Sequence, residues 1–105
     1  MNVQILGDNF TISDHTRRLV AEKLSLKLDR LLSKFSPEMH NCQLHITKDK
    51  LEKLRLSFDM QLPGKEHVYA STEHQVFESA LIDLVAEVER QIHRYREKVA
   101  GYSLG

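Results

Sequence analysis

The sequence has few of the residues that stabilise secreted domains or build flexible catalytic loops. A single cysteine, Cys42, excludes an internal disulfide and fits a reducing compartment. Only four glycines and two prolines occur, and the glycines fall at predicted turns or near the C-terminus, so there is no Gly-rich phosphate loop. No apolar run approaches a membrane span, and the first ten residues lack the basic start of a signal peptide. These absences predict a cytoplasmic protein without a membrane segment.

Signals of catalysis are also scarce. Cys42 alternates with apolar residues of a predicted strand, so we interpret it as a core side chain and not as a nucleophile. The six histidines show neither HxxxH nor HExxH spacing, and the pair His40 and Cys42 is too small a set to indicate zinc. We therefore expect no enzymatic activity, no metal and no cofactor.

Charge is balanced in total but not along the chain. The 105 residues, enough for a single domain over 1–105, hold 15 Lys+Arg and 15 Asp+Glu. Between 66 and 89 there is no lysine or arginine, but there are six acids, namely Glu66, Glu73, Glu78, Asp83, Glu87 and Glu89. The sign then reverses with Arg90, Arg94, Arg96 and Lys98. This segregation indicates separate acidic and basic surfaces.

Hydropathy periodicity predicts six elements. Alternating apolar residues indicate strands at 2–7, 40–46, 54–62 and 67–72, with a turn at 7–9 after the first strand and a hairpin turn at Pro63-Gly64. Helical spacing indicates a helix from 13 or 14 to about 35, stopped by the Ser-Pro pair at 36–37, and a second from about 75 to 99, ended by Gly101. Each element has one apolar side. The economical arrangement is an α+β fold, βαβββα, in which two helices cover one face of a four-stranded mixed sheet. Its core should hold Leu28, Phe58 and Leu84.

Basic side chains follow the edge of each predicted helix. On the first helix, an arc of roughly 60° beside the apolar stripe holds Lys23, Lys27, Arg30 and Lys34. A solvated face whose lysine stems cover the core edge explains this row equally well. On the second helix, the helix dipole accounts for Arg96 and Lys98 near the C-terminal end, but poorly for Arg90. If the helices lie side by side, the two rows form a surface suited to a ribose-phosphate backbone.

Familiar RNA-binding modules do not fit this pattern. Phe58 is predicted to face the core, so the open sheet face lacks the stacking aromatics of an RNA recognition motif. The last helix begins with the acidic stretch TEHQVFESALID, where a double-stranded-RNA domain has lysines, and no GxxG loop occurs. Recognition of shape and backbone is the mode that remains.

Four segments, in this order, resemble the short form of the family of ribosome hibernation-promoting factor and ribosome-associated inhibitor A, also called the sigma-54 modulation protein family. They are TISD, MQLPGKEHVYAS, FESALIDLV and, most specifically, ERQIHRYREK. The resemblance implies a translation inhibitor that binds the small ribosomal subunit and its rRNA, in the channel for messenger and transfer RNA, and silences idle ribosomes. It implies phosphate contacts by Lys23, Arg90, Arg94, Arg96 and Lys98, and a monomer off the ribosome.

The sequence departs from the family pattern at two points. Ala86-Glu87 stands where the family commonly has an Asp-Lys pair, and Lys27 follows Lys23 by four residues where three are usual. We expect the protein to be of the short form, without the C-terminal dimerisation domain of the long form, and action with a separate ribosome-dimerising factor stays open. The alternative function is a protein-interaction module that uses the acidic patch from Glu73 to Glu89 to meet a basic partner.

Overall fold

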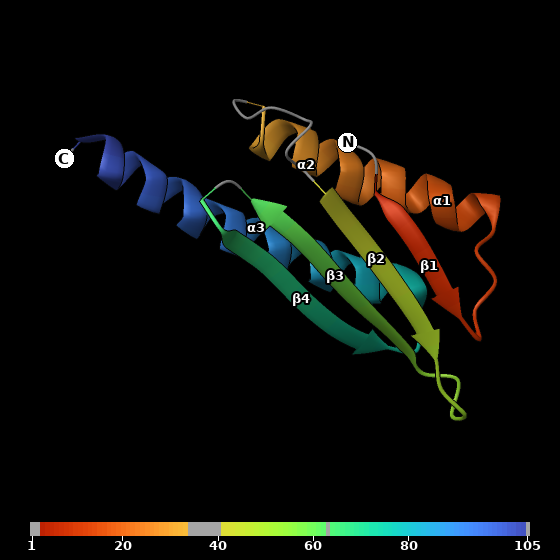
Figure 1. The fold of residues 1–105 in the computed structure, drawn as a ribbon. Helices are drawn as coiled ribbons and strands as arrows, with labels where there is room; N and C mark the ends of the chain where they lie inside the picture. Colours follow the sequence, from red (N-terminus) through yellow and green to blue (C-terminus); the bar gives the residue numbers. More distant parts are fainter. Residues whose placement is uncertain (1–2, 34–40, 63, 105) are drawn as a thin grey trace.

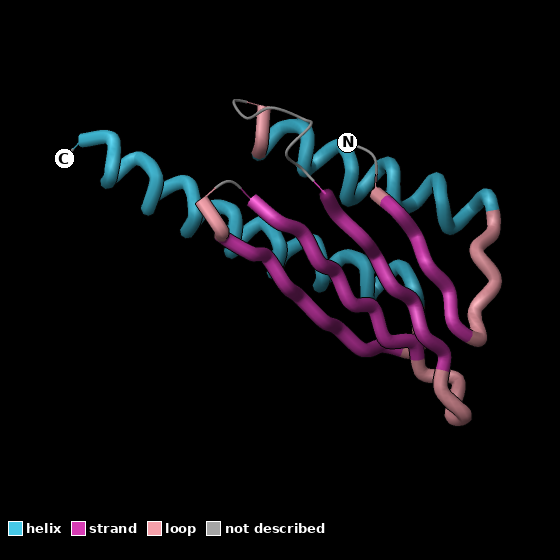
Figure 2. The backbone as a smooth tube through the Cα atoms, in the orientation of Figure 1, coloured by secondary structure: helices cyan, strands magenta, loops and turns pink. Residues whose placement is uncertain are grey.

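Two layers make up the protein, a four-stranded sheet and a pair of helices that lie behind it in the view of Figure 1. The structure, a computed structural model, describes residues 3–33, 41–62 and 64–104. The elements are β1 (Gln4–Asp8), α1 (Asp14–Val20), η1 (Ala21–Ser25), α2 (Leu26–Leu31), β2 (Asn41–Lys48), β3 (Leu54–Leu62), β4 (Glu66–His74) and α3 (Phe77–Leu104). The strand order is β1-β2-β3-β4, with β1 and β2 parallel and the other pairs antiparallel (Figure 2). The predicted βαβββα fold with a mixed sheet is confirmed.

The core lies between the sheet and the helices, as alternation in the strands requires. In β3 every second residue is buried, because only one face of the sheet meets the helices. Leu28, Phe58 and Leu84, the predicted core residues, are fully buried. Cys42 is buried beside them, as predicted, and burial raises the pKa of its thiol to about 11.

The first helix contains one turn of π-helix, which the sequence analysis did not anticipate. In η1 the Leu26 N–H donates to the Ala21 carbonyl five residues earlier. The buried side chains of this helix recur at every fourth residue, namely Val20, Leu24, Leu28 and Leu32. In a regular α-helix each four-residue step overshoots a full turn by about 40°, so the last of them would point well away from the first. The wider π turn absorbs part of that drift and keeps the row on the sheet.

Several predicted boundaries shift. The Ser13 hydroxyl accepts a hydrogen bond from the Thr16 N–H at 3.2 Å, so Ser13 is the N-cap. The helix ends at Leu31 and not near 35, and the predicted stop at 36–37 lies outside the described residues. The prediction that Gly101 ends the last helix is wrong, because α3 continues to Leu104. One glycine in a helix costs only about 1 kcal/mol, and no proline follows it.

Two glycines have geometric roles near the strand ends. A Cβ at Gly7 would lie 2.4 Å from the carbonyl oxygen of Phe10, so only glycine allows this close approach after β1. The predicted turn at 7–9 is displaced, since β1 runs through Asp8 and the chain bends at Asn9, with φ of 58°. Gly64, with φ of 82°, forms the predicted hairpin turn, whose other residue, Pro63, lies outside the described part.

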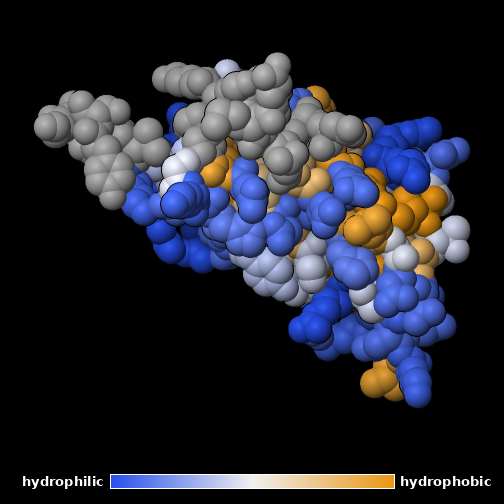
Figure 3. All heavy atoms as spheres, viewed as in Figure 1, coloured by the Kyte–Doolittle hydropathy of each residue, from blue (hydrophilic) through white to orange (hydrophobic). Residues whose placement is uncertain are grey.

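The face of the sheet away from the helices is open. Figure 3 shows this face, where hydrophilic residues dominate over β3 and β4 and hydrophobic ones gather toward β1. The side chain of Tyr69 is 54% exposed there, and the ring of Phe58 is buried on the other side, so the open face has no row of stacking aromatics among the described residues. Within the part of the chain that the structure describes, no helix is long and apolar enough to cross a membrane.

Candidate nucleic-acid interface

Three of the predicted basic residues share one flank of α3. Arg90, Arg94 and Lys98 follow one another at spacings of four residues, and all three line a hollow of about 260 Å³ between α3 and β4. Its floor is formed by Leu62, Val68 and the buried Tyr95, and its rim includes Glu66, whose carboxylate pairs with Lys98. The hollow therefore has apolar side chains beneath it and three basic residues at its rim, of which Arg94 alone has no ion pair among the described residues.

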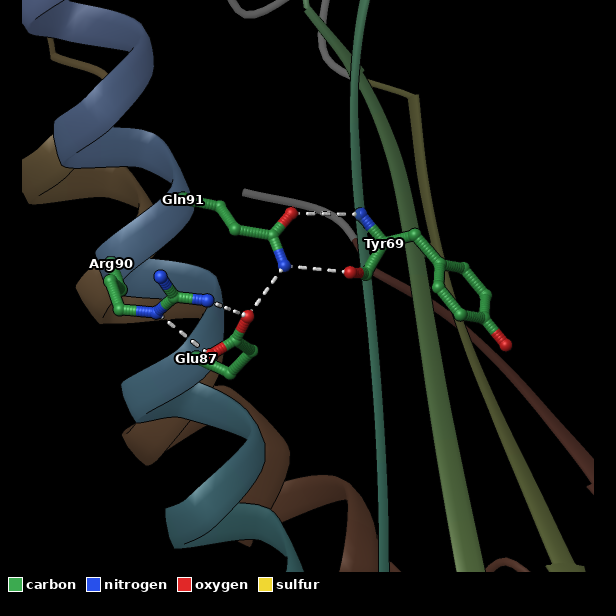
Figure 4. A network of polar contacts seen from close by, with 4 residues as sticks. All are labelled: Tyr69, Glu87, Arg90 and Gln91. Atoms are coloured by element: carbon green, nitrogen blue, oxygen red, sulfur yellow. Dashed lines mark hydrogen bonds and ion pairs between the residues drawn. The ribbon is translucent and has the colours of Figure 1, made fainter.

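A polar network holds one end of this flank, as Figure 4 shows. The Arg90 guanidinium donates two hydrogen bonds to the Glu87 carboxylate, at 3.0 and 2.6 Å. The Gln91 amide donates to Glu87 at 3.0 Å and also to the backbone carbonyl of Tyr69 at 2.7 Å. The Tyr69 N–H donates in turn to the Gln91 side-chain oxygen at 3.2 Å. The network thus joins two consecutive turns of α3 to the edge strand β4.

The network sets the protonation state of its acid. Hydrogen bonds from Arg90 and then Gln91 lower the pKa of the Glu87 carboxyl to about 2, and the same pairing raises the pKa of Arg90. Glu87 therefore stays ionised at neutral pH and neutralises Arg90. The charge of Glu87 acts against an anionic ligand at this end of the flank.

The lysines of the first helix meet the other flank of α3. Lys27 forms an ion pair with Glu89 at 2.9 Å, and Lys23 forms one with Glu78 at 3.7 Å. The acids that neutralise these lysines therefore come from α3 and not from the first helix. Because residues two apart on a helix point about 200° from each other, Glu89 and Gln91 face opposite sides of α3. The described contacts therefore place the two basic rows on separate flanks.

The remaining predicted residues differ in what surrounds them. Arg30, Arg94 and Arg96 are exposed, and none has an ion pair within 4.0 Å among the described residues. Lys34 lies outside the described residues. The basic set thus divides into four cations with an acidic partner, namely Lys23, Lys27, Arg90 and Lys98, and three without one in the described part.

Sequence reasoning missed two residues that shape this flank. The sequence analysis gives no role to Gln91, although a glutamine on the strand-facing side of a helix can bond to backbone groups of an edge strand. Glu66 was counted in the acidic stretch, and its pairing with Lys98 across 32 residues follows only from the fold. A helical wheel gives the direction in which a side chain points, but it does not show which strand lies beside the helix. Neither the contact of Gln91 with β4 nor the pairing of Glu66 with Lys98 could therefore be predicted from residue spacing alone.

The acidic stretch does not form a bare patch. Glu73 pairs with Lys53 and Arg55, and the three helical acids Glu78, Glu87 and Glu89 pair with Lys23, Arg90 and Lys27. This internal pairing disfavours the alternative of an acidic docking surface. No group of three or more potential metal-binding side chains occurs among the residues that the structure describes.

Comparison with known proteins places the chain in a family. The family model described as "Sigma 54 modulation protein / S30EA ribosomal protein" matches residues 3–100. The chain belongs to this family. The resemblance seen in the four sequence segments is thus confirmed, and the match takes in the whole sheet, the first helix and α3 as far as residue 100.

Several known proteins are similar to this chain in sequence or in fold. A ribosome hibernation promoting factor from Pseudomonas putida is 31% identical over 98 residues, which cover 93% of this chain and 89% of that protein. The crystal structure of the N-terminal domain of Protein Y from Thermus thermophilus superposes with a TM-score of 0.72 at 25% identity, covering 90% of this chain and 99% of that one. A ribosomal subunit interface protein from Coxiella burnetii shares the fold, with a TM-score of 0.69 at 21% identity and coverage of 92% and 99%.

Proposed function

We propose that this protein is a ribosome hibernation factor that binds the small ribosomal subunit in the messenger and transfer RNA channel and silences idle ribosomes. It acts in the cytoplasm, as a non-enzymatic binder that is monomeric off the ribosome. The observation that carries the proposal is the row of Arg90, Arg94 and Lys98 along one flank of α3, in a chain of the sigma-54 modulation family. Such a row suits contacts with successive rRNA phosphates.

The pairing of the cations ranks their contributions. A phosphate that binds Lys27 must displace or share Glu89, so the gain is reduced by the loss of the existing ion pair. Arg94 has no such pair among the described residues, so a phosphate adds to it without this loss. We therefore expect Arg94→Ala to weaken binding to small subunits more than Lys27→Ala does, although a sequence-based count treats them as equal.

The test measures affinity for isolated small subunits at several salt concentrations. Wild type should lose affinity with salt, and Arg94→Ala should reduce the log–log slope by about one unit, because one phosphate contact is lost. Arg18→Ala is the matched control, since Arg18 is an exposed arginine of α1 outside the proposed set. A salt-independent affinity, or equal effects of Arg94→Ala and Arg18→Ala, would contradict the proposal.

A further inference from the structure

The hollow between α3 and β4 differs from a plain phosphate-binding surface. Its rim carries three basic residues: Arg90 is paired with Glu87, Lys98 is paired with Glu66, and Arg94 has no ion pair among the described residues. Its floor, however, is made of Leu62, Val68 and Tyr95, which a phosphate has no reason to contact. The volume of about 260 Å³ is slightly below that of ordinary ligand pockets, so the hollow has room for one small ligand only.

The edge of β4 adds a hydrogen-bonding pair to this hollow. In an antiparallel ladder the residues that bond to the neighbouring strand alternate with residues whose N–H and C=O point the other way. Tyr69 directs both groups away from β3, to Gln91. His67, two residues earlier in the same regular register, therefore also directs its N–H and C=O outward, and His67 lines the hollow.

Gln91 limits which ligands can form hydrogen bonds with the outer edge of β4. Its amide occupies the outward groups of Tyr69 as a neighbouring strand would, so an extended peptide cannot add to β4 across that position. At His67 the outward N–H and C=O have no hydrogen-bond partner among the residues that the structure describes, and they lie beside the apolar floor. A flat group with an adjacent donor and acceptor on its edge matches this pattern, and a nucleobase has such edges.

We propose that the hollow accepts a single unstacked nucleotide of the bound RNA, with its base on the floor against the His67 edge and its phosphate at Arg94 and Lys98. This inference rests on the proposed function and names the ligand at that site. It predicts a contact that depends on the base, in an interface that otherwise depends on the backbone.

The first experiment follows backbone amide NMR signals of the free wild-type protein during titration. The probes are adenosine and uridine 5′-monophosphates, ribose 5-phosphate and inorganic phosphate. The nucleotides should shift the amide signals of His67 and Val68 as well as Arg94, whereas the two phosphates without a base should shift only the signals near Arg94 and Lys98. Identical shifts from all probes, with His67 unaffected, would overturn the inference and leave a simple anion-binding surface.

The second experiment separates this inference from the proposed function. Val68→Ile adds one methylene to the floor, so small-subunit affinity should fall roughly fivefold or more, the contribution of one base contact, with an unchanged salt slope. Arg94→Ala should instead change the slope. Wild-type affinity for a Val68→Ile variant that unfolds like wild type would refute the nucleotide site while leaving ribosome binding intact. If small subunits do not bind at all, the proposed function fails, and the NMR titration alone decides the inference; it decides likewise if Val68→Ile does not fold.

Discussion

The side-chain amide of Gln91 pairs with both backbone polar groups of Tyr69, at 2.7 and 3.2 Å. Tyr69 lies in the middle of β4, which is an edge strand of the sheet. Exposed edges are templates for pairing with a second chain, and folds commonly block them with charges, bulges or a covering element. Here a helix side chain takes the place of the missing strand, and Glu87 fixes its orientation by accepting a third hydrogen bond from Gln91.

Replacing Gln91 by leucine should therefore expose the edge. Three hydrogen bonds at partly exposed groups are lost, two to Tyr69 and one to Glu87, so the free energy of unfolding should fall by about 1.5–3 kcal/mol. Self-association should also rise, because the outward groups of Tyr69 become available to another β4. Urea unfolding and analytical ultracentrifugation measure the two effects.

Gln61→Leu is the control for this variant. Gln61 is an exposed glutamine on the open face of β3, so its replacement adds the same apolar surface without opening the edge. A Gln91→Leu protein that is as stable and as monomeric as the Gln61→Leu protein would show that the pairing does not protect β4.

Much of the fold could be predicted from the sequence because it depends on local periodicity. The alternation in 54–62 is complete, so the predicted and observed bounds of β3 agree. Phe58 and Leu84 were identified as core from the same patterns. What could not be predicted depends on which elements become neighbours: the pairs Lys27 with Glu89 and Lys98 with Glu66 join residues far apart in the sequence, and their partners follow only from the packing of the helices on the sheet.

The π turn is an intermediate case, since its signal was present but was not recognised. Four buried residues at a strict spacing of four, from Val20 to Leu32, favour a wider turn than the α-helix provides. The same turn lies beside the unusual spacing of Lys23 and Lys27 and brings both lysines to the α3 flank.

Deletion of Ala21 tests this interpretation. Ala21 is exposed within η1, and its removal should turn the π turn into a regular α-helical turn while the residues after it keep their orientation. The protein should fold cooperatively, with a change in the free energy of unfolding of at most about 1–2 kcal/mol.

Deletion of Ala86 is the matched control. Ala86 is an exposed alanine of α3, which is α-helical throughout, so its removal rotates the rest of the helix by about 100°. Val88 and Ile92 then leave the core, at a cost of about 1.5–3 kcal/mol each. Circular dichroism during urea unfolding distinguishes the two deletions. If both destabilise equally, η1 is not an inserted turn.

Cys42 should react slowly with thiol reagents in the native protein. Burial raises the pKa of the thiol from 9.0 to about 11, so the reactive thiolate is about a hundredfold rarer at neutral pH than in the unfolded chain, before steric shielding is counted. Because the folded-state pKa is the higher one, this group also lowers stability as pH rises from 9 toward 11. Reaction rates with and without denaturant provide the measurement. Equal rates would contradict the burial, and loss of small-subunit binding in a folded Cys42→Ser protein would contradict our expectation that this thiol is dispensable.

Glu87 is predicted to restrain Arg90 over the whole physiological pH range. Its folded-state pKa of about 2 lies below the ordinary value of 4.5, so the stability that the ion pair contributes is fully present above about pH 4.5 and is lost as pH falls through about 2. The carboxyl signal of Glu87 in NMR should therefore stay unchanged down to about pH 3.5. In Arg90→Ala, which removes the largest cause of the shift, the pKa of Glu87 should rise toward 4.5.

Releasing Arg90 should then strengthen ribosome binding. Glu87→Gln removes the carboxylate charge but keeps an acceptor for Gln91, so Arg90 becomes available to one further phosphate. One added contact steepens the log–log salt slope by about 0.9 and raises affinity for small subunits by up to about eightfold at 0.1 M salt. Glu87→Lys, which restores the family-like lysine, should also tighten binding, but it removes an acceptor from the network around Gln91 and should cost some stability.

Asp83→Asn is the control for charge alone, since Asp83 is an exposed acid of α3 without an ion pair among the described residues. If Glu87→Gln and Asp83→Asn raise affinity equally, the gain comes from net charge, and the bidentate pairing with Arg90 does not limit binding.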